Sequence, residues 1–88
     1  MRIKEGYIIK NLLGEYVVVS VGEASREFNG LIRMNKTGAF IWNEILNGAD
    51  TKEKVLSAML SSYEDLDEAM AEQELAFFLE TAEMALEE

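Results

Sequence analysis

The first third of the chain carries short runs of β-branched and aromatic residues that glycine-containing turns separate. Residues 7–9 form one run, and residues 16–21 form a longer one. Gly14 and Glu15 lie between these runs and predict a hairpin turn, because glycine readily adopts the positive φ that such a turn requires. Residues 30–34 form a third run, after a polar loop over residues 23–29. The pattern predicts a three-stranded antiparallel meander.

From residue 35 onward, apolar positions recur at helical spacing, and three helices are predicted. Asn35 is a favourable N-cap for the first helix. This helix is predicted to end at Asn47 and Gly48, where a residue can adopt the left-handed conformation. Asp50 or Thr51 caps the second helix, and Asp50 with Glu53 has the spacing of a capping box. The buried stripe of this helix is predicted to comprise Val55, Leu56, Met59, Leu60 and Tyr63. Because strands precede helices, the fold class is α+β, with a winged-helix-like arrangement.

The third helix is capped by Asp65 or Asp67 and is predicted to run to near residue 88. At about 100° per residue, one stripe forms its core face: Ala71, Leu75, Phe78, Leu79, Ala82, Ala85 and Leu86. A second apolar strip, about 100° away, comprises Met70, Phe77 and Met84. Two interpretations stay open. The second strip packs beneath the sheet or a loop, or it forms a partly exposed groove for an apolar peptide or a second subunit.

Charge is unevenly distributed along the 88 residues, whose net charge is −9. Residues 37–88 hold two lysines, Lys52 and Lys54, against thirteen acids. Nucleic acids and anionic membranes are therefore not expected as partners, because phosphates require Lys and Arg. The length fits one domain over residues 1–88. The sequence contains neither the apolar core of a signal peptide nor an apolar run long enough to cross a membrane, so a cytoplasmic protein is expected.

The sequence offers few residues that could serve in catalysis. The chain contains no Cys and no His, which excludes thiol nucleophiles, the common zinc ligand sets and the commonest general base. The acids at 64–68 lack the spacing of a calcium loop and are assigned to helix capping. Trp42 follows the apolar stripe of the first helix and is assigned to the core. We expect no enzyme activity, no cofactor and no metal ion.

Residues 29–42 resemble the signature of the PqqD family, small proteins of pyrroloquinoline quinone biosynthesis and their relatives. The family pattern is a short strand followed by Leu/Met-Asn-x-Thr-Gly-x-x-Ile/Leu-Trp, which this chain matches with Met34, Asn35, Thr37, Gly38, Ile41 and Trp42. Further matches lie at 15–19, at Gly48, Thr51 and Glu53, and at the spacing of Leu75, Phe78 and Leu79. The resemblance covers nearly the whole chain, although the family spans many pathways and does not by itself imply pyrroloquinoline quinone.

The resemblance implies a non-catalytic recognition element for ribosomally made, post-translationally modified peptides. Family members bind the leader of a precursor peptide as an added strand, between the third strand and the third helix. They present it to a modifying enzyme, often a radical S-adenosylmethionine protein. In this chain the implied cleft comprises Leu31, Ile32, Arg33 and Met34 on the strand, and Met70, Glu74, Phe77, Phe78, Thr81 and Met84 on the helix.

Within this cleft, Phe77 and Phe78 are the expected apolar anchors, and replacing both by Ala is expected to abolish peptide binding with the fold intact. Glu74 would pair with a basic leader residue and Arg33 with an acidic one. The acidic helix surface favours a basic partner over an acidic leader.

The alternative from another class is a structural or regulatory interaction domain without leader binding. The same edge strand and the strip of Met70, Phe77 and Met84 would then serve as a homodimer face or as part of an acidic adaptor. An enzyme is a third possibility, which would require activity without any His or Cys.

Overall fold

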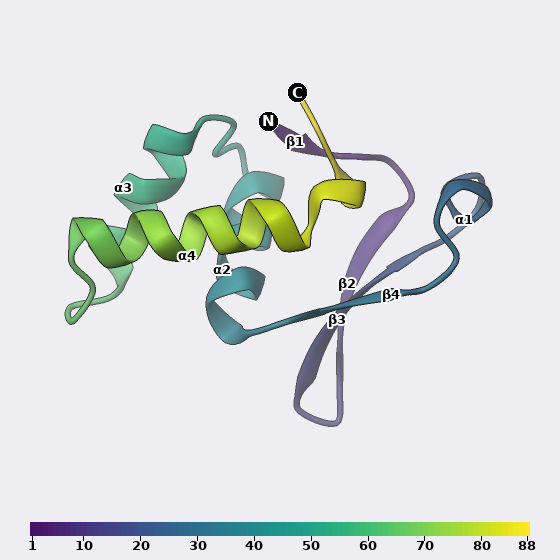
Figure 1. Ribbon diagram of the computed structural model, residues 1–88, viewed down its shortest axis with the longest axis horizontal. Coiled ribbons are helices and arrows are strands. Elements are labelled where there is room, and N and C mark those ends of the chain that lie inside the picture. The colour runs from purple at the N-terminus through teal and green to yellow at the C-terminus, as the bar shows by residue number, and fades with distance from the viewer.

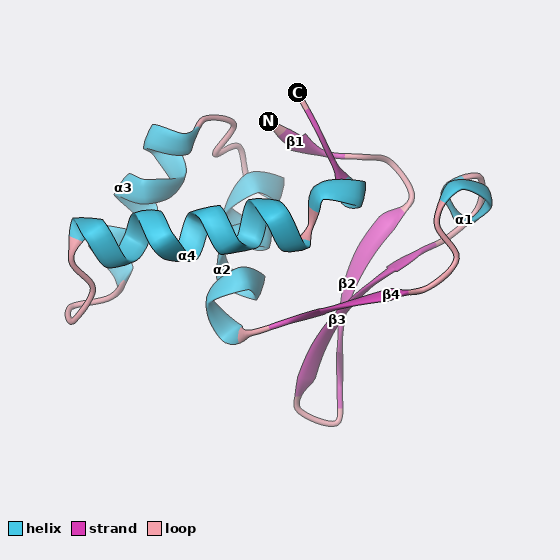
Figure 2. Ribbon diagram, viewed as in Figure 1, coloured by secondary structure: helices cyan, strands magenta, loops and turns pink.

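The computed structural model describes residues 1–88, with the longer strands and a short helix on one side and the three main helices on the other (Figures 1 and 2). The sheet has the order β2-β3-β4, and its strands are β2 (Tyr7–Leu12), β3 (Glu15–Ser20) and β4 (Leu31–Met34). The main helices are α2 (Lys36–Leu46), α3 (Lys52–Ser62) and α4 (Glu68–Thr81). This arrangement confirms the predicted α+β class, with a three-stranded antiparallel meander before three helices.

The hairpin between β2 and β3 is longer than its sequence suggests. Its ladder runs from Tyr7 opposite Ser20 to Leu12 opposite Glu15, so β2 extends three residues beyond the predicted run at 7–9. The turn residues are Leu13 and Gly14, with φ of 54° and 86°. Placing the turn at residues 14–15 was therefore wrong by one residue, because cross-strand pairing draws Glu15 into β3.

Side-chain caps begin all three main helices. The Asn35 side chain accepts a hydrogen bond from the Gly38 amide at 2.7 Å, as predicted. Thr51 accepts from the Lys54 amide at 3.1 Å, and Asp67 accepts from the Met70 amide at 2.8 Å. Of the alternatives left open by the sequence, Thr51 and Asp67 are therefore the caps.

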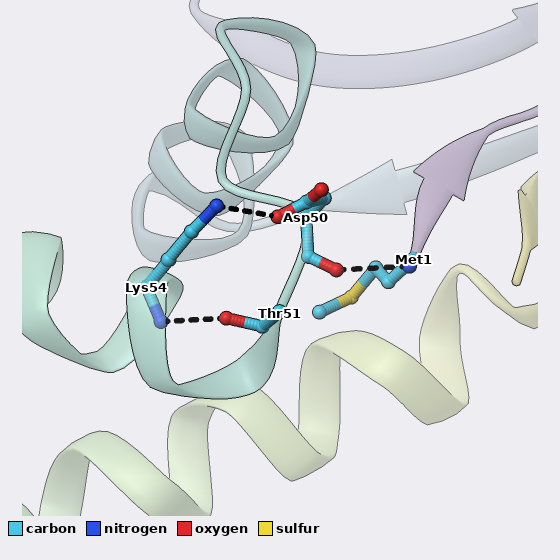
Figure 3. A network of polar contacts seen from close by, with 4 residues as sticks. All are labelled: Met1, Asp50, Thr51 and Lys54. Atoms are coloured by element: carbon cyan, nitrogen blue, oxygen red, sulfur yellow. Dashed lines mark hydrogen bonds and ion pairs between the residues drawn. The ribbon is translucent and has the colours of Figure 1, made fainter.

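The predicted capping box between Asp50 and Glu53 does not form, because the Asp50 side chain is engaged elsewhere (Figure 3). Its carboxylate accepts a hydrogen bond from Lys54 Nζ at 2.9 Å, and its backbone carbonyl accepts one from the amino group of Met1, also at 2.9 Å. The hydrogen bond from Lys54, helped by its positive charge, lowers the pKa of the Asp50 carboxyl.

Three further short elements lie where the sequence predicts a loop or the end of a helix. The loop at 23–29 contains a short helix, α1 (Ala24–Glu27). The third predicted helix ends at Thr81 and gives way to a 3₁₀ turn, η1 (Glu83–Ala85), and to β5 (Leu86–Glu87).

The early end of α4 follows from a long-range pairing. Strand β5 pairs antiparallel with β1 (Arg2–Ile3), which brings the two ends of the chain side by side (Figure 1). An Arg2–Glu87 ion pair at 3.2 Å and a hydrogen bond from the Lys4 amide to the Ala85 carbonyl at 2.8 Å add to this pairing. Helical periodicity cannot reveal a partner more than eighty residues away in the sequence.

The core lies between the sheet and the helices. Its largest fully buried side chains are Trp42, Ile41, Met59, Val18 and Val55, so Trp42 belongs to the core as predicted. The α4 side of this core consists of Ala71, Leu75 and Phe78.

Leu60 and Tyr63 are exposed, so the predicted stripe of α3 is too wide. Tyr63 lies at the C-cap, where its ring packs edge-on against Phe40. No helix combines the length and the apolar character that a membrane crossing requires.

The hairpin tip predicts a simple stabilising substitution. Leu13 is fully exposed at φ 54°, in the left-handed region that costs an L-residue roughly 1–2 kcal/mol. Asn tolerates this conformation, so Leu13→Asn should raise the free energy of unfolding in urea by about 0.5–1 kcal/mol. Leu12→Asn is the matched control, because Leu12 is also exposed but lies in β2. Equal effects of both substitutions would contradict the turn assignment.

Candidate functional site

Strand β4 presents a free backbone edge. It pairs only with β3, from Tyr16 opposite Met34 to Val19 opposite Leu31, so its outer amide and carbonyl groups have no neighbouring strand. Its side chains alternate, with Ile32 and Met34 half-buried against the core and Leu31 and Arg33 exposed. The predicted meander implies a free edge on its third strand, and the structure confirms it.

One side of α4 carries a partly exposed strip of the predicted site residues. Met70, Glu74, Phe77 and Thr81 are spaced by three or four residues, so they share one helix face. Phe77 is 58% exposed, and Met70 is exposed as well. The adjacent Phe78 is only 2% exposed and belongs to the core.

A shallow depression joins β4 to this face of α4. We call it the β4–α4 groove, and its lining residues are Arg33, Met34, Asn35, Gly38, Phe77, Phe78 and Thr81. Its volume is about 10 Å³, enough for one water molecule, so a larger occupant would have to lie over the depression or open it.

The start of α2 forms the floor at one end of the groove. Asn35 directly follows β4, and its cap fixes the turn from strand to helix. A Cβ on Gly38 would lie 3.2 Å from the capping oxygen of Asn35 and 3.6 Å from Met34. The absence of a side chain at Gly38 therefore lets β4, the cap and the helix approach one another closely.

The outer members of the predicted site lie apart from the depression. Met70 lines a separate hollow of about 410 Å³ beside Thr37, Tyr63 and Leu66. Met84 lies in η1, beyond the end of α4, so its predicted place on a continuous helical strip was wrong, because the helix stops at Thr81.

Charges at the site are few. Arg33 forms an ion pair with Glu15 on β3 at 3.0 Å, and both side chains are well exposed. Such a pair contributes at most about 1 kcal/mol, so a ligand carboxylate could displace Glu15 at little cost. Glu74 is half-buried and forms no ion pair. No group of three His, Cys, Asp or Glu side chains is placed to hold a metal ion.

Sequence reasoning found most of the groove but not all of it. Arg33, Met34, Phe77, Phe78 and Thr81 were predicted and lie together. Asn35 and Gly38 were not assigned to the site, although both stand in the quoted Asn-x-Thr-Gly motif, which was the available signal. Leu31 and Ile32 lie on β4 outside the depression.

Comparison with known proteins assigns the chain to a family. The family model for Coenzyme PQQ synthesis protein D (PqqD) matches residues 15–85. The chain belongs to the PqqD family. The matched segment includes β3, β4 and all three main helices, and thus every residue that lines the β4–α4 groove. None of the curated proteins matches the chain.

A solved structure shares the fold. The chain is similar to TbiB1 in complex with the TbiA(beta) leader peptide, with a TM-score of 0.72 and 19% sequence identity. The match covers 94% of this chain and 88% of the other. At this identity the similarity shows that this PqqD-family chain has the fold of TbiB1, in agreement with the predicted winged-helix-like arrangement.

The two phenylalanines of α4 should differ sharply in their effect on stability. Phe78→Ala removes a buried ring and should lower the free energy of unfolding by about 3–5 kcal/mol, whereas Phe77→Ala should change it by less than about 1 kcal/mol. Urea denaturation followed by circular dichroism measures both. Because Phe78 is a core residue, the double substitution that the sequence predicts to leave the fold intact is now expected to destabilise it. A large loss with Phe77→Ala would contradict the assigned orientation of α4.

Proposed function

We propose that this PqqD-family protein binds the leader segment of a ribosomally made precursor peptide as an added strand on β4. The observation that carries the proposal is the free edge of β4 beside the exposed face of α4 that includes Phe77. Support also comes from TbiB1, which shares the fold and was solved with a leader peptide.

Strand addition suits both the backbone and the side chains of the groove. The unpaired groups of β4 would supply main-chain hydrogen bonds, which give affinity with little dependence on sequence. An extended peptide places every second side chain on one face, so alternate residues would point toward α4. Specificity would then come from the side chains that meet Phe77 and Thr81.

Phe77 is the main candidate for the apolar anchor. Its ring is largely exposed at the wall of the groove, so an apolar leader residue covering it would remove that surface from water. Phe78 supports the same wall from the core, where it fixes the helix and has little surface left for a ligand. Met70 would contact the leader only if the peptide extends past the depression toward the N-terminus of α4.

The charges in and beside the groove favour a leader with at least one basic residue. Arg33 already has a carboxylate partner in Glu15, whereas Glu74 has no cationic partner. A Lys or Arg of the leader beside Glu74 would gain an ion pair that sets the register of the added strand more than its affinity.

Presentation to a modifying enzyme completes the proposed role. The protein would hold the leader without chemistry of its own and without a cofactor, while a separate enzyme, with the radical S-adenosylmethionine class the leading candidate, modifies the remainder of the precursor. The groove lies on one side of the molecule, so a bound leader would leave the rest of the precursor free to reach that enzyme.

Peptide capture tests the proposal. The immobilised protein is exposed to the soluble extract of its source cells, and retained peptides are identified by mass spectrometry. We expect a short ribosomal precursor on the wild type and a loss of about tenfold with Phe77→Ala, equivalent to roughly 1.4 kcal/mol. Leu12→Ala, an exposed leucine on β2, is the matched control and should retain the peptide. Equal retention by both variants would contradict the groove assignment.

Amide hydrogen exchange tests the binding mode. When the captured peptide is added, the outward-facing amides of β4 should exchange at least about tenfold more slowly, because they gain strand hydrogen bonds. The outer amides of β2, at the other edge of the sheet, serve as an internal control and should not change. Protection of α4 alone, with β4 unchanged, would indicate groove binding without strand addition.

A further inference from the structure

A second groove lies on the opposite side of α4. Its lining residues are Lys52 and Leu56 of α3 and Glu72, Leu75, Ala76 and Leu79 of α4, and we call it the α3–α4 groove. Its volume is about 210 Å³. A neighbouring hollow of about 420 Å³ shares Lys52 and Leu79 with it and continues to Glu83 and Leu86, so the two form one surface feature.

Helix geometry separates this surface from the leader site. At about 100° per residue, Leu79 lies roughly 200° from Phe77 around the axis of α4, and Ala76 lies roughly 200° from Glu74. The buried stripe of Ala71, Leu75 and Phe78 runs along the side of the helix between these two faces. The two grooves can therefore be occupied at the same time.

The floor of the α3–α4 groove is apolar. Across the combined surface feature the acidic side chains outnumber the cationic groups, with Asp50, Glu72, Glu83, Glu87 and Glu88 against Lys52 and the amino group of Met1. Leu56 and Leu79 are half-buried and Ala76 is exposed, so the seam between the two helices keeps accessible hydrocarbon. Glu72 and Glu83 are exposed and form no ion pair. Lys52 is the only cationic side chain in this lining, and no Lys or Arg follows Lys54 in the sequence.

We propose that the α3–α4 groove binds an amphipathic helix of a protein partner, with apolar residues on one face and Lys or Arg along its flanks. A groove between two helices accepts the apolar stripe of a third helix, and the acidic rim attracts basic flanks. If the leader-binding role holds, the modifying enzyme is the natural source of such a helix. The groove itself is argued independently of that role.

Charge argues against the other occupants. A second copy of the chain would bring another net charge of −9, with its helices equally acidic, against the same acidic rim. An anionic membrane surface would be repelled for the same reason. A basic helix is the occupant whose charge complements that of Glu72 and Glu83.

The test uses a fluorescein-labelled peptide of about 18 residues, five helical turns, with Leu and Lys at helical spacing. Fluorescence anisotropy in near-physiological salt measures its binding to the full chain. Ala76→Arg places a bulky cation in the groove at an exposed helical position and should weaken binding by at least about tenfold. Ser57→Arg adds the same charge at an exposed position of α3 that does not line the groove, and should change binding by less than about twofold.

Two further measurements distinguish the α3–α4 groove from the leader site and from a dimer interface. Phe77→Ala should leave binding of the Leu/Lys peptide unchanged although it weakens capture of the leader, so the experiment can contradict either proposal without the other. A peptide with Glu in place of Lys should not bind. No binding of the Leu/Lys peptide, or equal weakening by Ala76→Arg and Ser57→Arg, would overturn the proposal. A wild-type dimer in sedimentation that Ala76→Arg dissociates would assign the groove to a second copy and would also overturn it.

Discussion

The rotation of α4 about its own axis governs the functional surface of this protein. Ala71, Leu75 and Phe78 are buried against α2 and α3, and that burial fixes which side chains face outward. Phe77 then has to lie on the β4 side, while Leu79 has to lie over α3. A rotation that buried Phe77 in place of Phe78 would also bury Glu74 in place of Leu75. An unpaired carboxylate in the core would cost several kcal/mol.

The junction between β4 and α2 is the second constraint. Asn35 caps α2 immediately after the strand ends, and Gly38 permits the close approach that the cap requires. This short connection holds the free edge of β4 beside α4 without a loop that would cover it. An edge held beside a helix by such a short connection would be preorganised for an extended ligand, which would reduce the entropy lost on binding. The same residues that end the strand thus position the proposed leader site.

Charge divides the two halves of the fold. The cations are concentrated in the first 36 residues, whereas the helical half is strongly acidic. Both proposed ligands, a leader with a basic residue near Glu74 and a basic helix beside Glu72, follow from this asymmetry. Simultaneous occupation of the two faces of α4 would let one small domain join a peptide to the protein that modifies it.

The sequence by itself determined the order of strands and helices, the cap at Asn35, the core stripe of α4 and the family, because each depends on residues close together in the chain. It also placed Phe77 and Phe78 on different faces of the helix, although the family resemblance assigned both to the cleft. Only the tertiary structure decided that Phe78 is inaccessible and that α4 ends at Thr81. It also decided that β1 pairs with β5. These features depend on contacts between distant segments, whose free energy appears only when the whole chain packs.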